Sequence, residues 1–148
     1  MTVESASSIN DLNASYPADS DVRSDGAAHI RLLKTLLKAE RGMAITSKSA
    51  AYGFVLTDAN NAFLHPAADT TARTWTIPAN ASVAFPVGTV LTFINEHGAG
   101  VITIAITSDT MRLAGAGTTG SRTLAADGIA TAVKITSTSW LISGTGLT

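Results

Sequence analysis

The stretch TVLTFINEHGAGVITIAIT, residues 89–107, decides the fold class of this chain. Residues 89–94 and 101–107 are rich in Val, Ile, Thr and Phe, which favour β-strands, and residues 95–100 separate them as a loop. Similar short apolar runs recur from residue 50 onward, with turn signals about every ten residues. The sequence therefore predicts a mainly β body, an antiparallel sandwich or barrel.

The same pattern of strand-forming residues and turns predicts further strands. Thr contributes 19 of the 106 residues after Gly42, which favours strands over helices. A strand near Tyr52 should lead through a turn into a short return strand, an edge-type strand should follow, and a hairpin should close the sheet. These expected strands are residues 52–57, 62–65, 73–77, 131–136 and 139–143. Trp75, Phe93 and Trp140 are expected to anchor the core.

One helix is predicted before the β body, over residues 24–41. Ser24 or Asp25 can cap its start, and Gly42 is a typical helix stop. Its apolar side chains recur at helical spacing and form a stripe of Ile30, Leu33, Leu36 and Leu37, widened by Leu32. Such a stripe needs a surface to pack on. The β body, copies of the same helix and a partner protein all remain open.

Charge divides the chain near Gly42. Residues 1–42 carry 11 of the 21 charged side chains, although they are the shorter part. We interpret residues 1–42 as an arm and helix that attach the protein, and residues 43–148 as a β domain. Ile9, Leu12 and Tyr16 are widely spaced apolar residues in a polar segment, as in a docking arm. A plain disordered tail is the alternative.

Composition excludes several classes of protein. A net charge of -1 with scattered Lys and Arg argues against nucleic-acid binding, and the lack of cysteine excludes disulfides and thiolate sites. The polar N-terminus does not resemble a signal peptide, and no apolar run is long enough to span a membrane. Charged residues make up only 14% of the chain, against roughly 25% in ordinary domains. Burial of surface between subunits explains this deficit, and a surface of Thr hydroxyl groups is the alternative.

No pattern of catalytic or metal-binding residues emerges. Gly115 to Gly120 match G-x-G-x-x-G, but no helical pattern follows and no acidic residue stands about 20 positions later, as dinucleotide binding requires. The three histidines are far apart in sequence, which argues against a zinc site. The isolated Asp and Glu residues of the body lie in turn-like sequence. We expect no enzyme activity, metal or cofactor.

Two stretches resemble phage virion proteins. Residues 17–21 and 26–34, PADSD and GAAHIRLLK, resemble a segment near the N-terminus of many podophage fibre-type proteins. The body is similar to small β-domains of phage fibre and capsid-attached proteins, through residues 75–80, 86–89 and 94–95, then Trp140 and Gly144. The long shaft and large receptor-binding tip of a full tail fibre are missing.

This resemblance implies a structural virion component assembled in the host cytoplasm. The N-terminal segment would attach to a tail or capsid protein, and the β domain would project as a homotrimer. The expected attachment residues are Ile9, Leu12, Tyr16, Ile30, Leu33, Leu36 and Leu37. A capsid decoration protein or head fibre is an alternative. A second is a module that binds a host glycan or surface protein through loops 95–100 and 115–121, with Asn95, Glu96 and His97 as recognition residues.

Overall fold

A computed structural model describes residues 23–39 and 43–148 of the chain. The chain divides into two compact units, residues 1–44 and residues 45–148. Among the described residues, the helix belongs to the first unit and the strands belong to the second.

The helix α1 spans Arg23–Ala39, which confirms the helix predicted from the leucine spacing. Its first residue precedes Ser24, so Ser24 and Asp25 lie within the first turn. A difference of one or two residues at a helix end is common. The expected stop at Gly42 lies outside the described residues.

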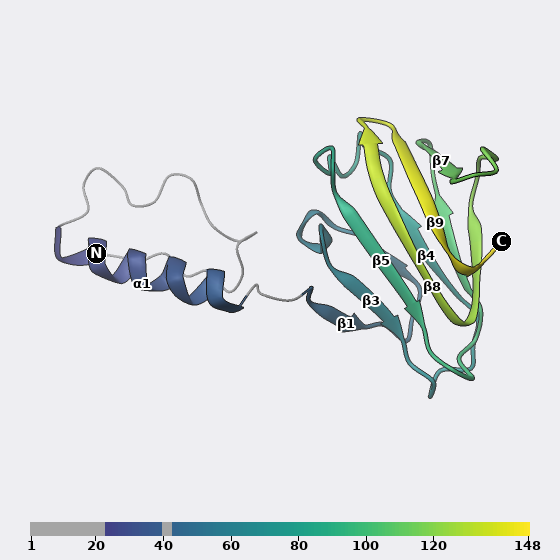
Figure 1. Ribbon diagram of the computed structural model, residues 1–148, viewed down its shortest axis with the longest axis horizontal. Coiled ribbons are helices and arrows are strands. Elements are labelled where there is room, and N and C mark those ends of the chain that lie inside the picture. Colours follow the sequence, from purple (N-terminus) through teal and green to yellow (C-terminus); the bar gives the residue numbers. More distant parts are fainter. Residues whose placement is uncertain (1–22, 40–42) are drawn as a thin grey trace. The chain divides into compact units, whose positions relative to one another are not determined.

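The second unit is a curled, open sheet, a half-barrel, in which the strand order is β1-β3-β5-β8-β6-β4-β2 (Figure 1). Strands β1 (Ile45–Ser47), β3 (Ala62–His65) and β5 (Val90–Asn95) form the odd wing, and β2 (Tyr52–Gly53), β4 (Arg73–Ile77) and β6 (Ile102–Ile106) form the even wing. A short 3-10 helix, Leu56–Asp58, lies between β2 and β3. The prediction of a mainly β body is confirmed.

Neighbouring strands within each wing are parallel, because the chain visits the two wings alternately. After β1 it crosses to β2, returns to β3, crosses to β4, and continues in this way to β6. Each strand therefore re-enters its wing in the same direction as the strand before it. Parallel strands need a long crossover. Here the crossover contains a strand of the other wing.

One long strand joins the two wings. The start of β8 (Arg122–Thr136) pairs with β6, and residues 129–133 pair with β5, both antiparallel. The strand changes register between Leu124 and Ile129, where Asp127 has a φ of 59° and Gly128 is buried. This bend lets one strand serve both wings. A bulge of this kind increases local twist and curls a sheet.

Strand β9 (Ser139–Leu147) completes a hairpin with β8, and β7 (Thr110–Leu113) pairs with its other edge in parallel (Figure 1). The closing hairpin predicted from residues 131–143 is thus confirmed, with longer strands than expected.

The core lies between the wings and against the hairpin. Trp75, Phe93 and Trp140 are each 0% exposed, which confirms their predicted role. The Trp75 ring of the even wing lies 6.4 Å from the Phe93 ring of the odd wing, centroid to centroid. Phe54, which follows β2, contacts Phe63 and Phe93 edge-to-face at 4.8 and 5.6 Å. Aromatic contacts across the wings therefore fix the curl of the sheet.

Three details of the sequence prediction are wrong. Five of the eight strand pairings are parallel, so the body is not an antiparallel sandwich. Residues 62–65 do not fold back on residues 52–57, since β3 lies between β1 and β5. Residues 73–77 do not form an edge strand, since β4 lies between β2 and β6. Alternating residue patterns show that strands exist, but they do not reveal which strands pair.

Candidate interaction surfaces and a buried polar network

The helix exposes part of its predicted stripe. Ile30, Leu33 and Leu37 are 54%, 43% and 62% exposed, and their spacing of three and four residues places them along one face. We call these three residues the helix stripe. Leu36 is only 4% exposed and is therefore not part of this exposed surface. The other expected attachment residues, Ile9, Leu12 and Tyr16, lie outside the described residues.

Basic side chains lie next to the helix stripe. Lys34 is exposed and lies four residues after Ile30 and three before Leu37, so it borders the helix stripe. Arg31, three residues before Lys34, is exposed on the far side of that lysine. An aliphatic stripe beside positive charges fits a partner helix or groove that is apolar at its centre and acidic at its edge.

One of the three residues predicted to recognise a ligand near the loop after β5 is buried. Asn95 is the last residue of β5 and only 1% exposed, so its side chain is not available to a ligand at the surface. Its side-chain amide forms hydrogen bonds inside the protein, where Nδ2 donates to the carbonyl oxygens of Gly100 at 2.9 Å and Leu124 at 3.0 Å. A polar group at this depth must find partners in the protein.

The other two loop residues are accessible. Glu96 is partly exposed and accepts a hydrogen bond from the backbone N–H of Ala67 at 2.7 Å. The His97 side chain is 91% exposed and its Nδ1 lies 2.8 Å from Oδ2 of Asp127, which is 65% exposed. Hydrogen bonding to Asp127 raises the pKa of His97. The loop therefore presents the partly exposed Glu96 and the exposed His97, which is paired with Asp127 of β8.

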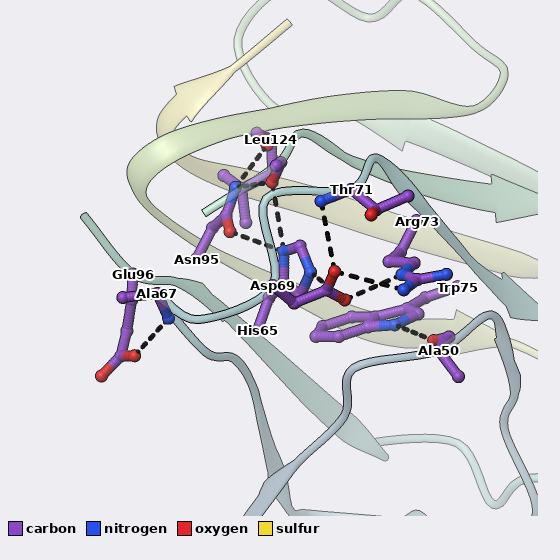
Figure 2. A network of polar contacts seen from close by, with 11 residues as sticks. Ala50, His65, Ala67, Asp69, Thr71, Arg73, Trp75, Asn95, Glu96 and Leu124 are labelled. Carbon is purple, nitrogen blue, oxygen red and sulfur yellow. Dashed lines mark hydrogen bonds and ion pairs between the residues drawn. The ribbon is translucent and has the colours of Figure 1, made fainter. Parts of the chain in front are cut away.

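A buried polar network lies behind this loop (Figure 2). Nε2 of His65, at the end of β3, lies 3.0 Å from Oδ2 of Asp69, and the ring is 0% exposed. Nδ1 of the same ring lies 3.0 Å from Oδ1 of Asn95 and 3.1 Å from the Gly100 carbonyl oxygen. Arg73 donates to both oxygens of Asp69, from Nε at 2.8 Å and Nη2 at 3.2 Å.

The partners of His65 determine its role. Asn95 directs its Nδ2 at two carbonyl groups, so its Oδ1 faces the ring, and both ring nitrogens of His65 therefore face acceptors. Arg73, with His65 and the Thr71 N–H, holds the pKa of the Asp69 carboxyl well below its usual range, although burial opposes this. The ring is thus held between a carboxylate and two neutral acceptors.

The network holds loops together. His65 and Arg73 close the segment 66–72, while Asn95 and Gly100 hold the segment 96–101 against β8 through Leu124. Because both nitrogens of His65 are engaged, the ring has no site left to accept a proton from a substrate. We assign the network a structural role. Among the described residues, no group of three or more His, Asp or Glu side chains is arranged to hold a metal ion.

Sequence reasoning did not identify this network. It treated His65 as a strand end and Asp69 as a turn residue. One signal was present, since His65, Asp69 and Arg73 place three ionisable side chains within nine residues of a weakly charged body. Their pairing became visible only with the loop geometry.

The second proposed recognition loop, residues 115–121, connects β7 to β8. Its backbone is held by hydrogen bonds from the Leu113 N–H to the Thr118 carbonyl and from the Gly120 N–H to the Met111 carbonyl. Arg122 also donates to the Thr118 carbonyl. Gly115, Gly117 and Gly120 have positive φ angles of 80°, 72° and 119°, so these glycines serve a turn between strands.

No protein-family model, curated protein or solved structure matches this chain. In residues 23–39 and 43–148, no helix has the length and apolar character needed to cross a membrane.

Proposed function

We propose that the protein is a structural component of a phage virion, a short trimeric fibre or spike-like tail protein anchored by its N-terminal segment. The observation that carries the proposal is the helix stripe, three large aliphatic side chains exposed at helical spacing beside Arg31 and Lys34. Such a stripe favours burial against a partner. The resemblance of residues 17–21 and 26–34 to the N-terminal segment of podophage fibre-type proteins supports a tail or capsid protein as that partner.

The second unit, residues 45–148 and called the β unit from here on, suits the part of a virion protein that projects from the particle. Its aromatic core joins the two wings, and its buried network ties two loops to β8. These features give a rigid body, and the proposal assigns it no catalytic step, metal or cofactor. The virion is the proposed location.

The anchor is tested by incorporation into particles. Phage that produce the Leu33→Lys, Leu37→Lys double variant should yield virions depleted of the protein at least tenfold, measured by quantitative mass spectrometry. Leu56→Lys is the matched control, because Leu56 is 53% exposed and lies in the β unit. Normal incorporation of the double variant would overturn the proposed anchor.

A capsid decoration protein or head fibre is the competing proposal. The proposed tail protein and this capsid-attached protein would share the trimer and the N-terminal anchor, and they would differ only in their location on the particle. Electron microscopy of particles labelled on the chain separates them, since label at the tail supports our assignment and label over the head supports the alternative.

A host-binding module is favoured by a different observation, the exposed pair formed by His97 of the loop after β5 and Asp127 at the bend of β8. Charged, accessible side chains on a rigid loop suit recognition of a polar surface. Binding of the protein to a glycan array or to host cells, abolished by His97→Ala together with Asp127→Ala, would support this function. Equal binding of the double variant and the natural sequence would reject this loop as the site.

A further inference from the structure

The outer face of the odd wing and the hairpin presents aliphatic side chains in rows. Side chains alternate along a strand, so residues next to the core residues Phe63, Phe93, Ala130 and Ile142 point to the other side of the sheet. The strand register aligns Leu64, Ile94 and Ile129 in one row across β3, β5 and β8. It aligns Val90, Val133 and Leu141 in a second row across β5, β8 and β9.

A row of hydroxyl side chains lies between these two aliphatic rows. It consists of Thr92, Thr131 and Ser143 on β5, β8 and β9. We call these three rows the outer face. None of its nine side chains carries a charge. Ile129 and Leu141 are 49% and 36% exposed, whereas Thr92 in the middle row is 7% exposed. β1 adds Ile45, 61% exposed, at the same edge.

The outer face has the size of a small surface patch. With strands about 4.8 Å apart and alternate residues about 6.7 Å apart, its nine positions cover about 290 Å² of sheet, and the six aliphatic positions make up about 190 Å² of this. A stable complex buries about 800 Å² on each partner, with an apolar centre and a polar rim. The outer face therefore fits the centre of an interface.

We propose that the outer face is buried against the outer faces of further copies of this chain. The proposal rests on the homotrimer of the proposed function, and it names the surface that forms it. The uncharged face offers nothing to select a partner of opposite charge, whereas a second copy brings the same alternation of aliphatic and hydroxyl rows. Interfaces between identical subunits are the most apolar class. Burial of this face also accounts for the small share of charged residues, 14% of the chain.

Crosslinking tests the contact directly, because the natural sequence has no cysteine. Thr131→Cys places one thiol at the centre of the outer face, and Leu56→Cys is a control outside it. On mild oxidation or with a short bismaleimide, the full-length Thr131→Cys variant should form covalent dimers at low micromolar concentration, and Leu56→Cys should not. An oligomer that forms without a Thr131→Cys crosslink would overturn the outer face as the contact, while leaving the proposed trimer in place.

A second pair of variants measures the energy of the contact. Ile129→Lys introduces a charge into the face, and we expect the dissociation constant to rise at least tenfold, with Leu56→Lys unchanged. Circular dichroism shows whether Ile129→Lys folds. If it does not, Ile129→Thr, which keeps a β-branched residue, replaces it in the association measurement. Unchanged association in a folded Ile129 variant contradicts the proposal. If the natural protein is a monomer, both this inference and the trimer fail, and virion incorporation still tests the anchor separately.

Discussion

At the scale of single residues, the few polar side chains buried in the β unit contribute more to its stability than their number suggests. Asn95 was expected to meet a ligand from a surface loop, yet it donates to two buried carbonyl groups and accepts from the His65 ring. Periodicity predicted the strand that carries Asn95, but it gave no information on the depth of the strand end. Only the register with β3, which pairs Asn95 with His65, explains the position.

Removal of the Asn95 amide should therefore be costly. Asn95→Ala leaves the Gly100 and Leu124 carbonyl groups without this donor, and we expect a loss of about 2–3 kcal/mol in the free energy of unfolding. Asn61→Ala is the control, because its Nδ2 donates to Thr57 at the surface. That change should cost less than about 1 kcal/mol. Urea unfolding measures both, and equal losses would contradict the structural role of the network.

The lowered pKa of Asp69 predicts the response to acid. Because the folded pKa lies below the unfolded value, the carboxylate stabilises the fold above about pH 4, and this contribution disappears as the pH falls through the folded pKa. The melting temperature of the natural protein should exceed that of Asp69→Asn at pH 7, and the gap should narrow on acidification. A gap that stays constant from pH 7 to about pH 2 would show that ionisation of Asp69 contributes nothing.

His97 should titrate differently. Its raised pKa means that its pairing with Asp127 is present below the usual histidine pKa and is lost as the pH rises through the folded value. Asp127→Asn should lower the pKa of His97, observed by NMR titration of the ring. Both side chains are exposed, so the melting temperature should barely change. A pKa for His97 unaltered by Asp127→Asn would show that the pair does not form in solution.

At the scale of elements, β8 is the strand on which the fold depends. Its bend between Leu124 and Ile129 lets one strand pair with β6, β5 and β9. The sequence signalled this segment only weakly, since Asp127 and Gly128 look like an ordinary turn and residues 122–124 were not predicted as a strand. The existence of β5, β6 and the hairpin followed from β-branched residues. The parallel wings did not, because strands from distant parts of the chain lie side by side.

Gly128 tests the bend. A Cβ added there would lie 2.5 Å from Cδ1 of Leu124 and 2.6 Å from the Ala125 carbonyl oxygen. Gly128→Ala should therefore cost about 2–3 kcal/mol of stability through forced movement of the backbone. At Gly53, in β2, an added Cβ meets no atom within 4 Å, and Gly53→Ala should change stability by less than about 1 kcal/mol. If both variants unfold at the same urea concentration, the tight approach in β8 does not exist.

At the scale of the whole molecule, the protein exposes two apolar surfaces, the helix stripe in the first unit and the outer face in the second. Our proposals assign them different contacts, the first with a tail or capsid protein and the second between copies of the chain. The low share of charged residues predicted a surface buried between subunits but not its location. The outer face that we propose for it depends on the strand register, because only the pairings show which aliphatic side chains share a row.

Assembly into a trimer is the central claim, and the mass of the purified full-length protein tests it most directly. The chain has a mass of 15.1 kDa. Multi-angle light scattering across low micromolar to hundred-micromolar concentrations should give about 45 kDa, the mass of a closed trimer. A single species at the mass of one chain across this whole range would contradict the account.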